Sequence, residues 1–372
     1  MSLTRAQLLL GLAAAAVLVV WLGAAAPSRS AAQPSAGTWR IVSSPPVPGG
    51  ELMGVAALSG SDVWAVGSRS VNGVFSPLAE HWNGSSWSSV PISAPGTFNE
   101  LLSVSGSSSS DVWGVGVSSN WSGLLEHWNG SSWKVVASPI AGAQTPIYSV
   151  RAFAGNDVWA TGAAGGHGTL LHYNGSSWSV VSHPEPAGST YTVFEKLAGT
   201  SPSDVWVAGS SQTSSQQTLV EHYDGSSWKI VRSAVQGSYN TVRGLVARTT
   251  GDAWLVGDWE DPAPSYTDHP LIQHWNGSSW SAVSSQVGEL WGVVALSATD
   301  AWTVGNRPSG SGYTSLVEQW NGSSWNVVTP PSAGTGNNEL NGIAAAGATL
   351  WAVGSYTPSG STQPLIETNP GG

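Results

Sequence analysis

The stretch His81-Trp82-Asn83-Gly84-Ser85-Ser86-Trp87 decides the fold, because close copies of it recur along the chain. Its final tryptophan returns at Trp87, Trp133, Trp178, Trp228, Trp280 and Trp325. A second stretch, Asp62-Val63-Trp64-Ala65-Val66-Gly67, recurs with its tryptophan at Trp64, Trp113, Trp159, Trp206, Trp254, Trp302 and Trp351. The spacings of this second series run from 46 to 49 residues, and a fixed period of that length indicates a repeat architecture.

One period, residues 51–90, contains four short apolar segments separated by clusters of Gly, Ser and Asn. These segments are rich in Val, Leu and Trp and show no helical periodicity, so they predict strands. Asn83-Gly84 predicts a tight hairpin turn, since both residue types accept a positive φ. Four strands in a period of this length are typical of a propeller blade.

The second-strand series predicts seven blades. The Gly-Ser-Ser-Trp strand occurs only six times, and Gly37-Thr38-Trp39-Arg40-Ile41-Val42 has the same form before the first full period. The last period stops at Leu365-Ile366-Glu367, before a fourth strand. We therefore predict an all-β, seven-bladed β-propeller of four-stranded antiparallel blades. We expect its ring to be closed by the N-terminal strand completing the last blade, which removes an exposed sheet edge.

Composition narrows the classes of partner. The chain has 12 Lys and Arg against 22 Asp and Glu, a net charge of −10, and no basic stripe, so we expect no nucleic-acid partner. It has no Cys, which excludes disulfides, thiolate metal sites, a Cys nucleophile and a lipid-modified Cys. Every period fits one array, so we predict a single propeller over residues 33–372 and a monomer.

Residues 1–32 predict an export signal. One early cation precedes a long apolar run, and Ser30-Ala31-Ala32 is a suitable cleavage site. The run is also long enough to remain as a membrane anchor. In either case we expect the propeller outside the cytoplasm, secreted or held at the cell surface.

The order of Val63–Gly67 and His81–Trp87 resembles the kelch repeat, over residues 37–369. The resemblance implies a propeller of the type found in the central domain of galactose oxidase. Most periods here have one Gly where kelch repeats have two. The activity of galactose oxidase needs copper and a Cys-modified Tyr, so the absence of Cys means that this activity is not implied. The stretch Val112–Gly116 is similar, more weakly, to tectonin-type lectin repeats.

Several repeated polar residues are expected to be structural. We predict that the Asp before each second strand ties its turn by accepting backbone N–H groups, and that the Trp series fill the inter-blade core. Glu80-His81 and its copies suggest acid–base chemistry, but adjacent strand residues point to opposite faces. Five Asn-Gly-Ser turns and Asn120-Trp121-Ser122 match glycosylation acceptors, although hairpin chemistry explains the five turns equally.

The expected binding surface is the face that carries the long connections, between second and third strands and between blades. The segment 258–269 is the longest of its class and holds four acids and two aromatics. The predicted ligand-binding residues are Trp259, Glu260, Asp261, Tyr266, Asp268, Trp121, Tyr313 and Tyr356. Clustered oxygens at Asp258, Asp261 and Asp268 also allow a Ca²⁺ site, and no other cofactor is expected.

These features predict a non-catalytic scaffold that binds a protein or cell-wall partner. The aromatic side chains with nearby carboxylates leave a carbohydrate-binding lectin as the alternative. A propeller hydrolase or lyase is a third hypothesis, for which the candidates are Asp258, Glu260, Asp261, Asp268 and His269. No spacing among these residues is specific to a reaction, so no catalytic residue is assigned.

Overall fold

The computed structural model describes residues 37–371 except Ser93, Ala141, Tyr266, Gln286, Val287, Ser311 and Ser359. The predicted export signal at residues 1–32 lies outside the described residues and stays a prediction. Ala36–Gly372 forms one compact unit. Within the described part of the chain, no helix is long and apolar enough to cross a membrane.

Antiparallel strands in chain order make up the first three sheets. They are β2 (Gly50–Ser59), β3 (Asp62–Val71), β4 (Val74–Trp82) and β5 (Trp87–Ser89), then β6 (Asn99–Ser108), β7 (Asp111–Ser118), β8 (Ser122–Trp128) and β9 (Trp133–Val135), then β10 (Ile147–Ala154), β11 (Asp157–Ala164), β12 (His167–Tyr173) and β13 (Trp178–Val181). A short 3-10 turn, η1 (Ser119–Trp121), joins β7 to β8.

The next sheet has eight strands, and two sheets of four follow it. The eight are β14 (Tyr191–Ser201), β15 (Asp204–Gln212), β16 (Gln216–Tyr223), β17 (Trp228–Val231), β18 (Tyr239–Thr249), β19 (Asp252–Glu260), β20 (Asp268–Trp275) and β21 (Trp280–Ala282). The last two sheets are β22 (Glu289–Ser297), β23 (Asp300–Ser309), β24 (Gly312–Trp320) and β25 (Trp325–Val328), then β26 (Asn338–Ala346), β27 (Thr349–Tyr356) and β28 (Gln363–Asn369) with β1 (Arg40–Ile41).

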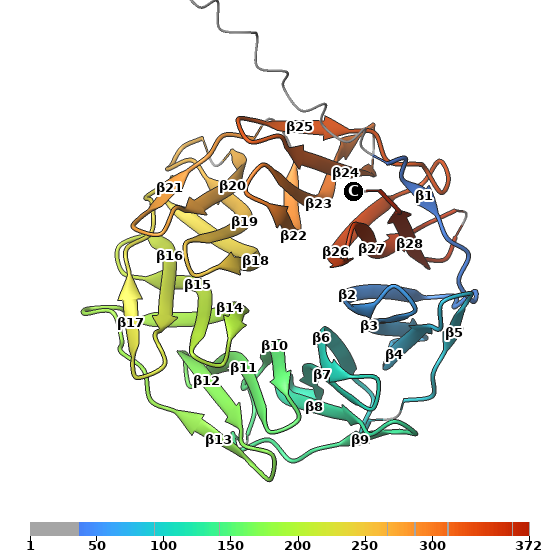
Figure 1. Ribbon diagram of the computed structural model, residues 1–372, viewed down its shortest axis with the longest axis horizontal. Helices are drawn as coiled ribbons and strands as arrows, with labels where there is room; N and C mark the ends of the chain where they lie inside the picture. Colours follow the sequence, from blue (N-terminus) through green and yellow to red (C-terminus); the bar gives the residue numbers. More distant parts are fainter. Residues whose placement is uncertain are drawn as a thin grey trace, which may run out of the picture. The chain divides into compact units, whose positions relative to one another are not determined.

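Together these sheets form a ring of blades with the first strand of each blade innermost (Figure 1). The eight-stranded sheet contains two four-stranded antiparallel units, joined only by the parallel pair Gln216 and Tyr239. Neighbouring first strands contact one another around the ring, and β26 contacts β2. The predicted all-β propeller of four-stranded antiparallel blades is therefore confirmed.

The N-terminal strand closes the ring as predicted. β1 pairs antiparallel with β28, with Arg40 opposite Thr368 and Ile41 opposite Glu367. The amide of Val42 also donates to the carbonyl of Ile366, at 2.9 Å. The chain therefore supplies the fourth strand of its last blade from its N-terminal side, where the outer edge of β28 would otherwise be unpaired.

The core lies between blades, where tryptophans pack edge to face. Each second-strand Trp is at most 5% exposed and contacts the fourth-strand Trp of the next blade. Trp64 and Trp133, for example, have ring centroids 5.4 Å apart at 85°. The same contact closes the ring through Trp302 with Trp39 and Trp351 with Trp87. Edge-to-face packing adds to the area that each ring buries, so the predicted role of the Trp series is confirmed.

The prediction of long connections between second and third strands is wrong for most blades. β3 continues to Val71 and β4 begins at Val74, joined by a turn at Asn72 and Gly73, whose φ angles are 51° and 77°. In the segment 258–269, β19 ends at Glu260 and β20 starts at Asp268, so strand covers only its two ends. Second and third strands form hairpins whose tips are short in most blades.

Candidate functional site

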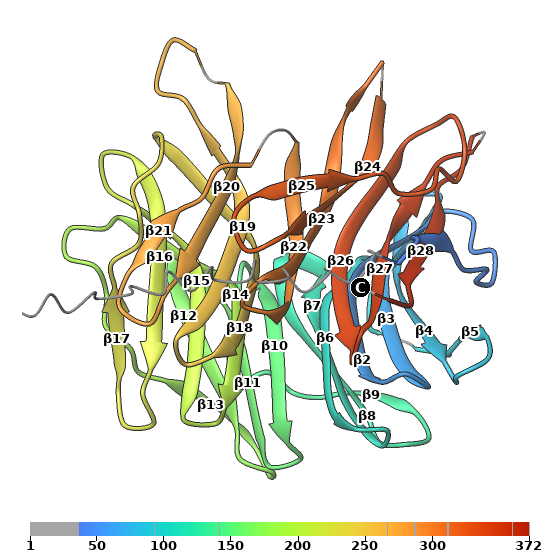
Figure 2. The same ribbon diagram turned by 45° about the horizontal axis from the view of Figure 1, so that its top comes forward.

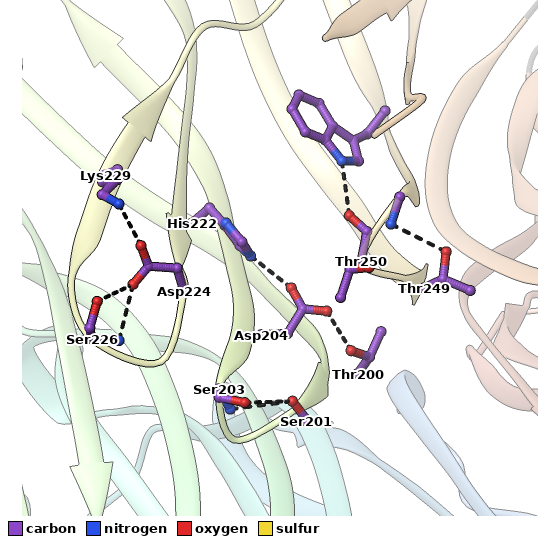
Figure 3. Close-up of polar contacts among 12 residues, drawn as sticks. Thr200, Ser201, Ser203, Asp204, His222, Asp224, Ser226, Lys229, Thr249 and Thr250 are labelled. Atoms are coloured by element: carbon purple, nitrogen blue, oxygen red, sulfur yellow. Dashed lines mark hydrogen bonds and ion pairs between the residues drawn. The ribbon is translucent and has the colours of Figure 1, made fainter. Parts of the chain in front are cut away.

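The repeated His and Asp residues form the same hydrogen-bonded pair within most blades. Figure 3 shows the pair His222 and Asp204. His222 Nε2 lies 2.7 Å from Asp204 Oδ1, Thr200 donates to the other carboxylate oxygen, and the His222 ring stacks 4.0 Å from Trp206. The equivalent His–Asp distances range from 2.7 to 3.1 Å. These histidines and aspartates therefore bind one another within the blades.

The predicted role of the repeated Asp is wrong in its detail. The turn N–H groups are accepted by a Ser or Thr two residues earlier, as Ser203 donates to Ser201 Oγ at 3.3 Å (Figure 3). The hairpin interpretation of the Asn-Gly-Ser turns is confirmed. Asn83 Oδ1 accepts the amides of Ser85 and Ser86, both at 3.0 Å. The repeated Asp bonds the third-strand His instead of the turn amides, and in three blades it also accepts from a side chain four residues earlier.

A Glu precedes three of these His residues, as Glu80, Glu126 and Glu221, and it points the other way, as alternation requires. Glu80 is fully buried while the side chain of His81 is 27% exposed. Burial raises the pKa of Glu80 and of Glu126 to about 7, and that of Glu367 to about 8. The Glu and the His of a pair therefore cannot act on the same substrate atom.

In three blades the buried third-strand group holds the segment that leaves the preceding blade. Glu221 Oε1 lies 3.4 Å from His183 Nδ1, and Ser285 donates to Glu318 at 2.6 Å. Gln273 replaces the acid in its blade and makes two 2.9 Å bonds with the backbone of Ala234. These contacts latch one blade to the next, which is a structural role.

We define the hairpin face as the end of the ring that carries the second-to-third-strand hairpins and the connections between blades. The tips of the β19–β20 and β23–β24 hairpins project on this side (Figure 2). The predicted ligand-binding residues belong to the second-to-third-strand hairpins, and they differ in exposure and in contacts.

Trp259, Asp261 and His269 form a compact group at the β19–β20 hairpin. The Trp259 and His269 rings stack 4.2 Å apart, and His269 Nε2 lies 3.1 Å from Asp261 Oδ2. Trp259 is half-buried and packs against the core around Trp206. Because His269 covers one face of the Trp259 ring, that face is not open to a ligand.

The remaining predicted residues are dispersed. Glu260 and Asp268 pair across the hairpin, and Asp268 is exposed. Tyr356 is half-buried and packs against the core of the last blade. Tyr313 is 39% exposed. Tyr266 lies outside the described residues, so its predicted role is neither supported nor contradicted.

The carboxylates suggested for Ca²⁺ have other partners. Asp258 forms an ion pair with Arg243, and Asp261 faces His269. Among the residues that the structure describes, no group of three or more His, Asp or Glu is placed to hold a metal ion. The Ca²⁺ site stays a prediction without support from this geometry.

Trp121 is the most prominent of the predicted residues. Its side chain is 51% exposed at the tip of the β7–β8 hairpin, and its ring lies 6.1 Å from Phe98. Asn120 and Trp121 have φ angles of 64° and 56°, which are costly for residues other than Gly. The amide of Thr145 holds this tip by donating to the Trp121 carbonyl at 2.8 Å. The backbone thus keeps a large ring in solvent.

Two further tyrosines are exposed at the same end of the ring. Tyr191 and Tyr239 are 40% and 46% exposed at the starts of β14 and β18. Burial and the nearby Glu195 and Tyr239 raise the pKa of Tyr191. We call Trp121, Tyr191, Tyr239 and Tyr313 the aromatic rim. It lies on the face predicted from the sequence, but only Trp121 and Tyr313 were among the predicted binding residues.

Comparison with known proteins identifies the fold and no family. No family model matches the chain, and no curated protein matches it. A structure described as YCF48 bound to D1 peptide is 13% identical, covers 90% of this chain and 99% of its own, and has a TM-score of 0.56. YCF48 from Cyanidioschyzon merolae is 12% identical, covers 90% of this chain and 99% of its own, and has a TM-score of 0.55.

The WD40 repeats of RRP9 give 13% identity, 90% and 98% coverage, and a TM-score of 0.57. Likeness at this identity concerns the fold alone. It supports a β-propeller repeat protein, and the kelch resemblance stays a prediction.

Proposed function

We propose that the propeller is a non-catalytic scaffold outside the cytoplasm that binds a protein partner across the aromatic rim. The observation that carries this proposal is the set of four large aromatic side chains exposed at one end of the ring. Tyr and Trp anchors are enriched where proteins bind one another. The strained backbone at Trp121 supports it, since such strain gathers at functional sites.

The remaining observations agree with a binding role. The His–Asp pairs that resemble acid–base machinery are held inside the blades. The acidic residues suggested for a hydrolase are spread over cross-strand and ion-paired positions. In the solved structure of the same fold, YCF48 is described as bound to a peptide, so a ring of this shape can present a peptide site.

Carbohydrate binding is the second candidate. The exposed ring of Trp121 could stack on the apolar face of a sugar, which is the observation that favours it. The covered ring of Trp259 weakens the sugar site expected at the β19–β20 hairpin.

Site-specific photocross-linking tests the proposal in the cells that make the protein. A photoreactive amino acid replaces Tyr239 or Tyr313 on the rim, or Ser226 in an exposed turn at the opposite end as a matched control. We expect one defined protein adduct from the rim positions and none from Ser226. Equal labelling from both ends, or no adduct from the rim, contradicts the proposal.

A glycan array on residues 33–372 separates the two candidates. Specific sugar binding that Trp121→Ser abolishes would make the rim a lectin site. No sugar binding, together with a protein adduct, leaves the scaffold proposal standing.

A further inference from the structure

A cavity of about 750 Å³ occupies the centre of the ring. Its walls are the first strands of all the blades, β2, β6, β10, β14, β18, β22 and β26. Most lining residues are Gly, Ala, Ser, Val or Leu, and such small side chains leave the centre open. A volume of this size is in the range of small-molecule sites.

The charged lining of this cavity is cationic. Arg151, Lys196 and Arg243 line it, with Asp62 as the one acid in its wall among the described residues. Asp62 lies 2.8 Å from His81 Nε2. Removing Arg5 and Arg29, which precede residue 33, from the 12 Lys and Arg leaves 10 cations against 22 acids. Three of so few cations therefore line the central cavity of a strongly acidic propeller.

The three cations come from consecutive first strands, β10, β14 and β18, which contact one another. Arg243 forms an ion pair with Asp258, and its guanidinium lies 4.1 Å from the centre of the Trp291 ring. Both contacts fix the position of Arg243. The cationic side of the cavity therefore has one fixed member.

Arg151 and Lys196 have no such partner. Within the described residues, neither side chain forms an ion pair or a hydrogen bond, and the guanidinium of Arg151 has only the Phe153 ring, at 5.5 Å. Burial lowers the pKa of Lys196, the nearby Glu195 opposes this effect, and Arg243 adds to it. Arg151 is exposed and lines the cavity. An anion beside Lys196 would reverse the destabilisation of its charged form.

The nearest acids compensate this side of the cavity only in part, through Asp258 beside Arg243 and Glu195 beside Lys196. Glu195 turns to the next blade, where its Oε2 accepts the amide of Val242 at 3.3 Å, and burial raises its pKa to about 7. Four other acids stand one residue before a fully buried Leu of their first strands and do not line the cavity: Glu51, Glu100, Glu289 and Glu339.

We propose that the central cavity binds a small organic anion whose carboxylate or phosphate group is held by Arg151 and Lys196. Arg243, fixed by Asp258, adds a third positive charge to the lining of the cavity. A guanidinium can hold two oxygens of either group at once, while the ammonium acts as a point charge. The small neutral side chains of the other strands leave room for the rest of the molecule.

This site is separate from the aromatic rim. Its ligand is a small anion rather than a protein surface, and none of the four rim residues lines the cavity. Failure of either proposal therefore leaves the other unaffected.

Calorimetric titration of residues 33–372 tests the anion site, with inorganic phosphate, succinate and citrate as separate probes at constant ionic strength. We expect saturable binding of at least one probe, and at least a tenfold loss in the double variant Arg151→Gln with Lys196→Gln. The matched control is Lys134→Gln with Arg232→Gln, which removes two exposed cations outside the cavity. Preference for phosphate or for the carboxylates identifies the source of the anionic group.

Lysine titration by NMR tests the unmodified sequence in case the double variant does not fold. After residue 33 the chain has three lysines, Lys134, Lys196 and Lys229, so ¹³C-methylation gives a simple spectrum. We expect Lys196 to titrate below its ordinary value and to shift upward on adding the bound probe, with the other two unchanged. Absence of saturable binding by all three probes, equal loss in both double variants, or an unchanged Lys196 titration overturns the proposal.

Discussion

The blade interfaces and the centre of the ring use the repeated sequence in opposite ways. At the interfaces one arrangement recurs, in which a buried second-strand Trp meets the fourth-strand Trp of the next blade. At the centre, equivalent positions differ, and Tyr148, Glu195, Arg243, Trp291 and Asn341 all follow the buried apolar residue of a first strand. The interface contacts are thus repeated around the ring, while the residue types at the centre differ from blade to blade.

The largest expected effect comes from removing an interface tryptophan. Trp206→Ala should destabilise the propeller by about 3–5 kcal/mol, as large-to-small core changes do, because Trp206 is 1% exposed and contacts three aromatic rings. Trp121→Ala, at the exposed rim, should change stability by less than about 0.5 kcal/mol. Urea unfolding of both variants measures the difference, and equal losses would contradict the division between interface and rim.

The interface could be predicted from sequence because the same residues recur at a fixed period. The closing strand was recognisable for the same reason, since Trp39 stands in another copy of the fourth strand. The hairpin at Asn72-Gly73 was missed because its flanks lack alternating apolar residues, although the turn pair itself was a signal. Pairing between β3 and β4, rather than a local pattern of apolar residues, extends these strands to the turn.

The site was less predictable, since it depends on divergent positions. Arg151, Lys196 and Arg243 belong to no repeated motif, and their meeting follows only from aligning the first strands on their buried residues. That alignment was available in the sequence. The sequence did not show which positions face the cavity, because bulges interrupt the first strands, as between Phe194 and Lys196.

The second effect concerns pH and the buried glutamates of the interfaces. For Glu126 the folded pKa is raised from 4.5 to about 7, so its contribution is fully present below 4.5 and is lost as the pH rises through about 7. A shift of this size corresponds to about 3 kcal/mol. Unfolding free energies should therefore fall between pH 5 and pH 8, and Glu126→Gln should remove part of that fall.

The sequence provides a natural control for this prediction, since Gln273 occupies the same place in its blade with both side-chain ends bonded. Gln273→Glu should steepen the decline in stability between pH 5 and pH 8. Below pH 3.8 the trend reverses at Asp111, whose pKa is lowered chiefly by the hydrogen bond from His127. Identical pH profiles for the parent protein and both variants would show that these groups do not control the dependence.

A smaller effect is expected at the His–Asp networks. His222→Ala removes both the 2.7 Å contact with Asp204 and the ring stacked on Trp206, which should cost about 1–3 kcal/mol. His222→Gln should cost less, because Gln319 makes the equivalent bond to Asp300 at 3.0 Å in another blade. Thermal unfolding of the two variants separates the contribution of the hydrogen bond to stability from that of the ring stack. Equal losses would assign the whole effect to the ring.

The smallest effect tests how far the turns tolerate divergence. Asp224 takes the place of Asn in one turn, accepts the same amides from Ser226 and Ser227, and pairs with Lys229, which lowers its pKa. Asn129→Asp places a carboxylate at the matching position of a second turn, in which Lys134 follows the Trp as Lys229 does. Asn83→Asp has only Ser88 at that position.

Both substitutions should alter stability by less than about 0.5 kcal/mol, since each keeps the oxygen that accepts the turn amides. They should differ in titration. The carboxylate introduced by N129D has a Lys partner and should have the lower pKa, measured by NMR as a function of pH and weakened by salt. Equal pKa values would mean that the Lys229 contact is not reproduced in the matching turn, and that even the repeated turns are individually tuned.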